Sequence, residues 1–286
     1  MDGVIANPAP VGSDCNQNSI IAVWAVMKSL LALAGIAAAV LPIAEASAQL
    51  VGTFRVRPGV GVQIRPEYPG ADKSEWAPYF NFSIARDDNP FRVGAPDDSF
   101  GIGLISSDGF SAGPIAAIEG SRKESDVGAP VGKVPTTFEA GAFVQHEFGE
   151  SFRLRGEVRK GIGGHEGIVG SVGADHIWRD GDSYAVSVGP RLLFSNARYQ
   201  RAYFGVSPEA ALASGLEPHR PGGGLHAIAA TSGMQYSLGG GWGLFGYARY
   251  ERLVGDARKS PIVRELGSPN QFSAGIGLNR SFTIKL

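Results

Sequence analysis

Residues 270–286 read NQFSAGIGLNRSFTIKL, and apolar and polar side chains alternate along almost the whole stretch. Even positions from Phe272 to Leu286 are apolar apart from Arg280, whereas odd positions are polar or glycine. Because successive side chains of a β-strand point to opposite faces, the stretch predicts a strand with one apolar and one polar face. It is long for a strand, and Arg280 lies near its end, where a long side chain can extend to a membrane interface.

The alternation recurs down most of the chain, and few residues remain to cover the apolar faces. Lipid covers such faces in a transmembrane barrel, which leaves no unpaired backbone edge in the bilayer. We therefore predict an all-β fold, a transmembrane antiparallel β-barrel of about 10–12 strands. The expected strands are 54–65, 76–86, 91–105, 110–122, 138–148, 152–160, 168–178, 184–194, 203–206, 225–238, 242–253 and 270–286.

The short connections test these boundaries. Short turns of outer-membrane barrels lie on the periplasmic side, yet those near 150, 180 and 240 follow the fifth, seventh and tenth expected strands. At least one boundary is therefore misplaced, and we place the error near 91–105 or 195–207. The apolar phase of 91–105 shifts near Asp97 and Asp98, which predicts a bulge or a hidden turn. Pro58 predicts a local irregularity in the first strand, and residues 207–215 read as a short helix.

Aromatic residues flank two of the short turns. Phe148 and Phe152 border the first, and Trp178 and Tyr184 border the second. Rings that are apolar at one end and wet at the other favour the headgroup level of a membrane. The pattern predicts an interfacial aromatic girdle.

The first 48 residues predict export. Residues 27–48 read as a secretory signal peptide, with Lys28 in a short basic region, an apolar core and an A-x-A cleavage site ending at Ala48. We expect translation to start at Met27 and residues 1–26 to be a mis-assigned upstream leader; the alternative is an unusually long basic region. Residues 49–286 then form the outer-membrane barrel domain. The only cysteine, Cys15, precedes the cleavage site, and the near-neutral charge gives no reason to expect a nucleic-acid partner.

The sequence contains no evident catalytic, cofactor or metal site. Asp175 and His176 are adjacent, so on a strand they face opposite sides and cannot form a dyad. Residues 161–167, GIGGHEG, favour a turn over a phosphate cradle because no G-K-[ST] follows. His146 and His176 share the apolar register near strand ends, and no metal-ligand spacing occurs. We therefore expect a protein that is not an enzyme and has no cofactor.

Charged side chains fall on the expected lumenal face. They have two interpretations, a salt-bridged filling or the lining of a narrow pore, and pairing is the commoner role of such groups. The candidate lumen-lining residues are Arg55, Arg57, Arg153, Arg155, Glu157 and Arg159.

Four stretches resemble the MltA-interacting protein and OmpV family of outer-membrane proteins. They are RPEYPGAD at 65–72, FRLRGEVRKGIGGHEG at 152–167, YFGVSPEAALASGL at 203–216 and GDARKSPIVRELGSPNQFSAGIGL at 255–278. The resemblance implies an outer-membrane barrel surrounded by lipid. For the name-giving branch it implies a scaffold that bridges a murein-cleaving lytic transglycosylase and a murein synthase, a penicillin-binding protein. It carries over no catalytic residues. Family members end on an aromatic residue, whereas here the matching Phe282 is followed by four more residues.

Three of these stretches supply candidate partner-binding residues, although their prolines and glycines can equally serve only to shape turns. The main alternative to a scaffold is a narrow pore or solute-binding barrel with an arginine-lined lumen, and a third is an adhesive surface protein. The candidate partner-binding residues are Tyr68, Asp72, Tyr203, Phe204, Asp256 and Arg258.

Overall fold

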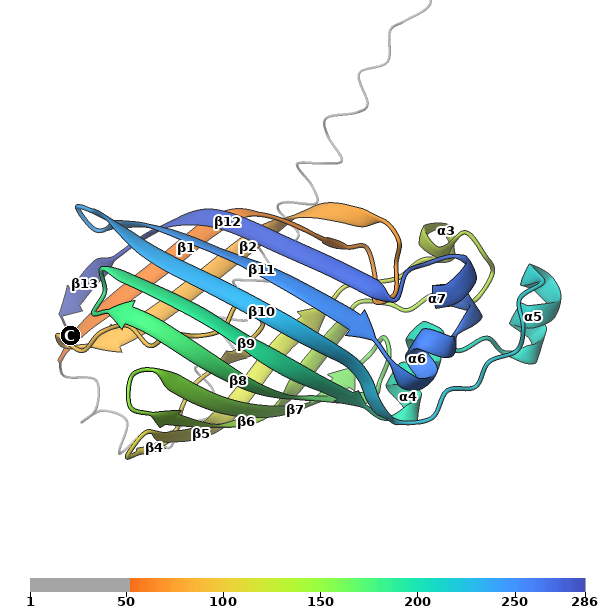
Figure 1. Cartoon of the computed structure of the whole chain (residues 1–286), viewed down its shortest axis with the longest axis horizontal. Helices are drawn as coiled ribbons and strands as arrows, with labels where there is room; N and C mark the ends of the chain where they lie inside the picture. The colour runs from red at the N-terminus through yellow and green to blue at the C-terminus, as the bar shows by residue number, and fades with distance from the viewer. Residues whose placement is uncertain (1–51, 286) are drawn as a thin grey trace, which may run out of the picture. The chain divides into compact units, whose positions relative to one another are not determined.

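The computed structural model describes residues 52–285, so the leader and signal peptide predicted over 1–48 lie outside the described residues. Residues 53–285 form one compact unit, an antiparallel sheet curled into a barrel with short helices at one end (Figure 1). The strands are β1 (Thr53–Pro66), β2 (Ser74–Arg86), β3 (Phe100–Gly101), β4 (Ile105–Ser107), β5 (Phe110–Glu119), β6 (Thr137–Phe148), β7 (Phe152–Ile162), β8 (Ile168–Asp180), β9 (Tyr184–Ser195), β10 (Gly224–Gly239), β11 (Trp242–Leu253), β12 (Asn270–Arg280) and β13 (Phe282–Lys285). The helices are α3 (Glu124–Val127), α4 (Ala197–Phe204), α5 (Pro208–Ser214), α6 (Gly255–Lys259) and α7 (Pro261–Glu265).

The strands occupy eleven positions around the wall, within the predicted range. Around the wall the order is β2, β1, β12, β11, β10, β9, β8, β7, β6, β5. β3 and β4 share one further position beside β5, and β13 shares the position of β12 beside β1. β1 pairs β13 through Val56 and β12 from Gly59, so this ladder breaks at Pro58, where the sequence predicts an irregularity. The wall is tight: a side chain at Gly61 would place its Cβ 2.1 Å from the Ile276 carbonyl oxygen.

Within residues 52–285, no strand pairing joins β2 to β3 or β4. Every neighbouring pair is antiparallel and the wall has eleven positions counting both edges, so β2 at one edge and β3 at the other run in the same direction. The missing strand corresponds to residues 87–99, which enter the lumen instead of the wall and which we call the inner segment. The predicted strand 91–105 is therefore wrong except at 100–101 and 105–107. Pro90, Pro96 and adjacent Asp97 and Asp98 explain the difference, since proline and buried charge suit a lipid-facing wall poorly.

The predicted strand 203–206 is also wrong, because Tyr203 and Phe204 end helix α4. Asn196 caps that helix by accepting a hydrogen bond from the Tyr199 amide at 3.1 Å. Because this expected strand does not exist, the conflict over the short turns disappears. The turns at 149–151, 181–183 and 239–241 all lie at one end of the barrel, together with Thr53 and Lys285, which pair with each other. We call this the turn end. The predicted helix at 207–215 is confirmed as α5, with Ser207 as its cap.

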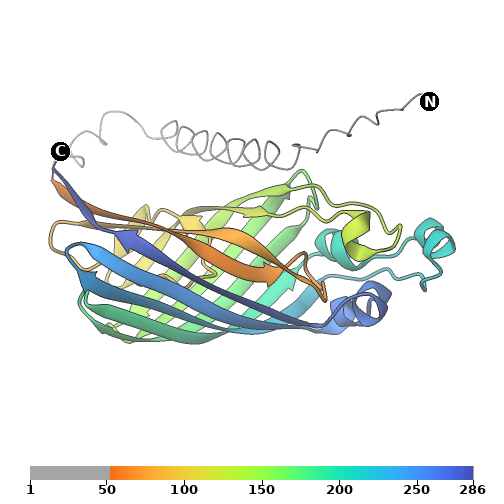
Figure 2. The ribbon, with the colours of Figure 1, turned by 90° about the horizontal axis from the view of Figure 1, so that it is seen from above.

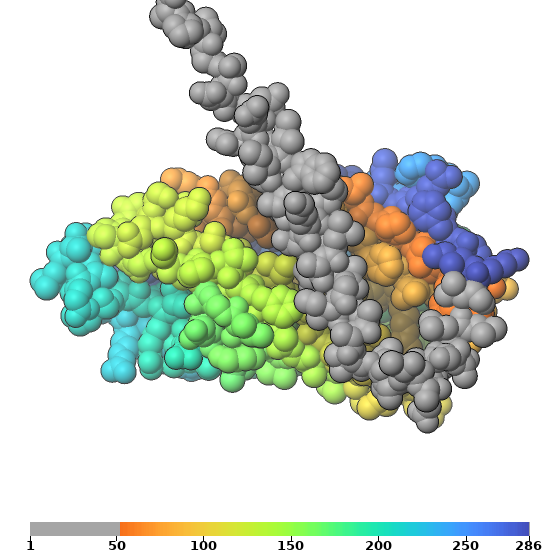
Figure 3. All heavy atoms as spheres, turned by 180° about the vertical axis from the view of Figure 1, so that it is seen from behind, coloured from red at the N-terminus to blue at the C-terminus, as the bar shows by residue number. Residues whose placement is uncertain are grey.

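The opposite end, which we call the helix end, carries the long connections and all described helices (Figure 2). Its core consists of two packed clusters, one around Tyr203 and Phe204, the other around Tyr68 and Ile262. The buried Ser260 hydroxyl donates to the Phe204 carbonyl at 2.7 Å, and the Arg122 guanidinium donates to the Tyr203 carbonyl at 2.7 Å. These bonds tie the loops together into an ordered cap, from which α5 protrudes in the space-filling view (Figure 3).

The outer surface of the barrel is apolar. On β2, Trp76, Phe80 and Phe82 are 74%, 53% and 53% exposed, while side chains between them turn inward. Exposed rings at the turn end include those predicted for the girdle, Phe148, Phe152, Trp178 and Tyr184. The Arg280 guanidinium is stacked on nearby rings, 5.0 Å from the Trp242 centroid. This surface suits a hydrocarbon surrounding with an aromatic border.

Candidate functional site

The inner segment crosses the lumen from the end of β2 toward the opposite wall. Phe91 and Ala95 are 3% and 7% exposed. Pro96 lies against β10, since a Cβ built on Gly233 would lie 2.9 Å from its ring. The segment therefore occupies the middle of the barrel and narrows any passage through it.

Two consecutive aspartates attach this segment to the wall. Asp98 pairs with Arg153 at 2.5 Å and with Arg155 at 3.5 Å. Asp97 pairs with Arg191 at 3.0 Å and with Arg249 at 3.3 Å. Charge-assisted hydrogen bonds of this kind are stronger than neutral ones.

A third carboxylate, Asp175 of β8, connects the ion pairs of Asp97 with those of Asp98. We call these ion pairs together the aspartate layer. Asp175 pairs with Arg153 at 2.5 Å and with Arg191 at 2.7 Å, and it is 1% exposed. Each of these buried guanidinium groups thus has carboxylates on two sides, which offsets the cost of removing it from water. Burial by itself would raise the pKa of Asp97, but Arg249 and Arg191 hold that pKa below its ordinary value.

On the turn-end side of the aspartate layer, the start of the inner segment is held at Phe91, which contacts wall arginines and Asp182. The guanidinium groups of Arg57 and Arg55 lie 4.1 and 4.9 Å from the Phe91 ring centroid. Asp182 accepts a hydrogen bond from the Phe91 amide at 2.9 Å and pairs with Arg55 at 2.8 Å. The inner segment is therefore held at both its beginning and its end.

On the helix-end side, a second set of pairs lines the wall. Arg159 binds Glu139 at 2.7 Å and Glu157 at 2.8 Å, and Glu139 also contacts His165 at 2.9 Å. Arg155 binds Glu157 at 2.7 Å. The charges are thus arranged as a continuous ion-pair network and not as a row of free cations.

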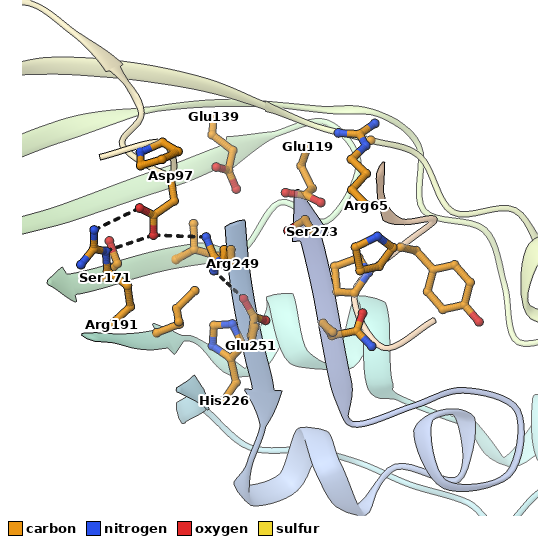
Figure 4. Close-up of a pocket in the computed structure, with 18 of the residues that line it drawn as sticks. Arg65, Asp97, Glu119, Glu139, Ser171, Arg191, His226, Arg249, Glu251 and Ser273 are labelled. Atoms are coloured by element: carbon orange, nitrogen blue, oxygen red, sulfur yellow. Dashed lines mark hydrogen bonds and ion pairs between the residues drawn. The ribbon is translucent and has the colours of Figure 1, made fainter. Parts of the chain in front are cut away.

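Between the inner segment and the cap lies a cavity of about 330 Å³ (Figure 4). Pro96 and Asp97 line it on one side and Tyr199 on the other, and the strands supply charged side chains between them. Among these, Arg191, Arg249 and Glu251 are in the ion pairs drawn around Asp97 and Arg249. Glu119 also points into the cavity.

The six candidate lumen-lining residues all have contacts inside the barrel. Arg153, Arg155, Glu157 and Arg159 belong to one network together with Asp98, Asp175 and Glu139, while Arg55 and Arg57 contact Phe91. Sequence reasoning missed Asp97, Asp98, Arg191 and Arg249. The phase shift at 97–98 was the available signal, but it does not reveal that the aspartates turn inward.

The six candidate partner-binding residues all lie at the helix end. Tyr68, Tyr203 and Phe204 are 4%, 0% and 0% exposed and pack inside the cap, so their side chains are not available to a partner in this conformation. Asp72 and Arg258 are exposed. Asp256 is partly exposed and accepts a hydrogen bond from the Gly222 amide at 3.1 Å. The structure brings the three buried side chains into the cap core and leaves the charged ones at its surface.

Two histidines have a potential catalytic partner beside them: His176 follows Asp175 in the sequence, and His226 contacts Ser195. Asp175 is buried whereas His176 is exposed, as their opposite faces predict. His165 lies in a tight turn, where its Nδ1 accepts the Gly167 amide hydrogen bond at 2.9 Å. The His226 Nδ1 and the Ser195 hydroxyl are 3.0 Å apart, a pair that the sequence analysis did not identify. Among residues 52–285 no carboxylate hydrogen-bonds the other ring nitrogen of His226, so the pair lacks the orienting group of a triad.

Metal ligation and membrane-spanning helices can be assessed over the described residues. No group of three or more histidine, cysteine, aspartate or glutamate side chains in residues 52–285 is arranged to hold a metal ion. No described helix is both long and apolar enough to cross a membrane.

The chain was compared with known families and proteins. Residues 59–282 match the family described as MltA-interacting protein MipA. No curated protein sequence matches. Among solved structures, an outer membrane channel from Pseudomonas putida F1 is similar at 10% identity, covering 85% of this chain and 97% of that one, with a TM-score of 0.40. An anion-selective porin from Comamonas acidovorans is similar at 12% identity, covering 81% and 99%, with a TM-score of 0.33. These likenesses carry no argument about what this chain binds or transports.

Proposed function

The chain belongs to the MltA-interacting protein MipA family, and from this premise we propose that it is a non-enzymatic outer-membrane scaffold that bridges a murein hydrolase and a murein synthase. The fold is that of an outer-membrane β-barrel. The proposed partners are a lytic transglycosylase, as the hydrolase, and a penicillin-binding protein, as the synthase.

The observation that carries this proposal is the filled lumen. Asp97 and Asp98 place two carboxylates among four wall arginines, so the middle of the barrel is occupied and its charges are paired. A barrel whose lumen is narrowed in this way is better suited to act through its surfaces than through its interior.

The turn end is the surface proposed for docking. Long loops of outer-membrane barrels face outward and short turns face the periplasm, where the murein layer lies. By this rule the helix end, with the candidate partner-binding residues, faces away from murein enzymes. The turn end instead presents exposed carboxylates in its turns, at Asp87, Asp88, Asp108, Glu150 and Asp180. We propose that these carboxylates, and not Tyr68, Asp72, Tyr203, Phe204, Asp256 or Arg258, meet the partners.

Site-specific photo-cross-linking in intact cells tests this orientation and the scaffold role together. A photoreactive amino acid at Glu150, in the β6–β7 turn, is expected to capture lytic transglycosylases or penicillin-binding proteins, identified by mass spectrometry. The matched control is the same amino acid at Leu212, which is 90% exposed on α5 at the helix end, and it is expected to capture neither. Capture from Leu212 alone would reverse the proposed orientation. Recovery of only assembly factors from both positions would reject the scaffold.

A solute-binding barrel is a second candidate, and the cavity of about 330 Å³ favours it. This volume is at the lower end of the range for small-molecule sites. Passage of a solute through the whole barrel would require the inner segment to move. Ion conductance that changes when Arg153 and Arg155 are made neutral would support this candidate.

A further inference from the structure

Two carboxylates that line the cavity between the inner segment and the cap, Glu67 and Glu119, differ from the other charged groups around it. Within residues 52–285, the guanidinium groups lining it have carboxylate partners: Arg191 and Arg249 with Asp97, Arg159 with Glu139, and Arg65 with Glu75 at 2.8 Å. Neither Glu67, in the β1–β2 loop, nor Glu119, the last residue of β5, has a cationic atom within ion-pair distance in the described part of the chain. Of the two, Glu119 lies on a strand of the wall and points into the cavity, so it is the carboxyl group best placed to meet a ligand there.

The neighbouring acids do not relieve this imbalance. The Glu139 carboxylate is already occupied by Arg159 at 2.7 Å and by His165 at 2.9 Å. Glu251 is held by Arg249 at 2.5 Å. A carboxylate removed from bulk water without a partner is costly, so a cation entering the cavity would be stabilised at Glu119.

The rest of the cavity suits an organic cation. Tyr79 of β2 and Tyr247 of β11 line it, with ring centroids 4.9 Å apart. Aromatic faces attract ammonium groups and also pack against alkyl chains. In the described residues no cluster of acidic and histidine side chains is arranged for a metal ion. The volume of about 330 Å³ is at the lower end of the range for small-molecule sites, so a compound with a short alkyl chain fits inside.

We propose that this cavity binds a small primary ammonium compound, with its charged nitrogen at Glu119 and its alkyl part against Tyr79 and Tyr247. The site is separate from the turn-end surface, so it does not depend on the proposed scaffold role. Ligand binding inside the barrel and partner docking outside it are independent properties.

Calorimetric titration of the purified protein in detergent tests the proposal with three probes of matched size, n-butylammonium, 1-butanol and butyrate. We expect saturable binding of the ammonium compound and an affinity at least 10-fold weaker for the neutral and anionic probes. Glu119→Gln keeps the shape of the side chain and removes its charge, and it is expected to weaken butylammonium binding at least 10-fold. Glu209→Gln, on the exposed surface of α5, is expected to leave binding unchanged.

Two results would overturn the proposal. The first is the absence of butylammonium binding to the wild-type protein, which would mean that Glu119 is neutralised by a proton or by movement of Arg65. The second is equal binding by wild type and Glu119→Gln, which would locate the ammonium site elsewhere. The Glu119→Gln protein must first show the folded, unheated gel mobility of wild type, so that lost binding is not lost folding.

Discussion

Replacing Asp97 and Asp98 together by asparagine is expected to open the barrel to ions. The two carboxylates hold the end of the inner segment through pairs with Arg153, Arg191 and Arg249, at 2.5, 3.0 and 3.3 Å. Asparagine keeps the size of each side chain but removes the charge. The variant therefore leaves wall guanidinium groups facing a segment that no longer neutralises them.

The magnitude follows from the burial of these pairs. Removing one partner of a buried ion pair costs about 3–5 kcal/mol, and Arg153 is 1% exposed. Suppose that about 3 kcal/mol of this cost destabilises the inner segment in its observed position relative to a displaced one. The ratio of molecules with a displaced segment to molecules with the segment in place then rises about 150-fold. A channel that is almost always closed would then open often enough to be recorded.

Single-channel recording in planar bilayers measures the outcome. We expect rare openings for wild type and frequent openings for Asp97→Asn with Asp98→Asn. Asp88→Asn is the matched control, since Asp88 lies in the same segment but is exposed, and it is expected to behave as wild type. Introducing Pro96→Cys and Gly233→Cys into the double variant gives a disulfide that should restore the closed state and release it on reduction. The only native cysteine, Cys15, lies before the predicted cleavage site.

The reasoning would be refuted if the double variant, folded by gel mobility, conducted no more than wild type. It would be refuted equally if the disulfide formed but left the conductance of the double variant unchanged, because ions would then pass by a route that the inner segment does not block.

Three further predictions concern pH and stability. The pKa of Asp97 is held below its ordinary value, whereas burial raises the pKa of Asp98, so acid acts on the two groups in opposite directions. In the Asp98→Asn variant only the Asp97 effect remains: its contribution to the closed state is present above the ordinary aspartate pKa and is lost as pH falls through the lowered value, so conductance should stay unchanged down to about pH 4.5 and rise in stronger acid. Phe204 is 0% exposed in the cap, so Phe204→Ala should destabilise the fold by about 3–5 kcal/mol. The measurement is the temperature at which folded mobility on gels is lost, which should fall. A shift as small as that of the exposed control Leu212→Ala would contradict the prediction. Gly167→Ala would place a Cβ 2.6 Å from the Tyr199 amide nitrogen, so it should cost about 1–3 kcal/mol, while Gly156→Ala, where the nearest atom is 3.8 Å away, should cost less in the same assay.

Most of the wall could be predicted from local alternation. The expected strands 138–148, 184–194 and 242–253 differ from β6, β9 and β11 by one residue or less at each end. The errors occurred where local patterns compete with distant contacts. Residues 203–206 have the composition of a strand, yet Tyr203 and Phe204 become helical because they fill the cap core.

The candidate site was less predictable than the fold. The lumenal face of β7 could be inferred, because a row of arginines in the polar register must face water or partners. Its partners could not be inferred, since Asp98 and Asp175 lie 55 and 22 residues from Arg153 in sequence. For the candidate partner-binding set, the sequence could not distinguish the buried Tyr203 from the exposed Arg258, as exposure depends on how the loops fold over one another.

The sequence by itself determined the class of fold, the apolar face of most strands and the family, because side chains two residues apart share a face of a strand. Only the tertiary structure decided that residues 87–99 lie in the lumen, that Asp97 and Asp98 neutralise wall arginines, and that Glu119 faces a cavity with no cationic partner among residues 52–285. The physical reason is that ion pairing and burial depend on distances between segments far apart in the chain, which no local period encodes.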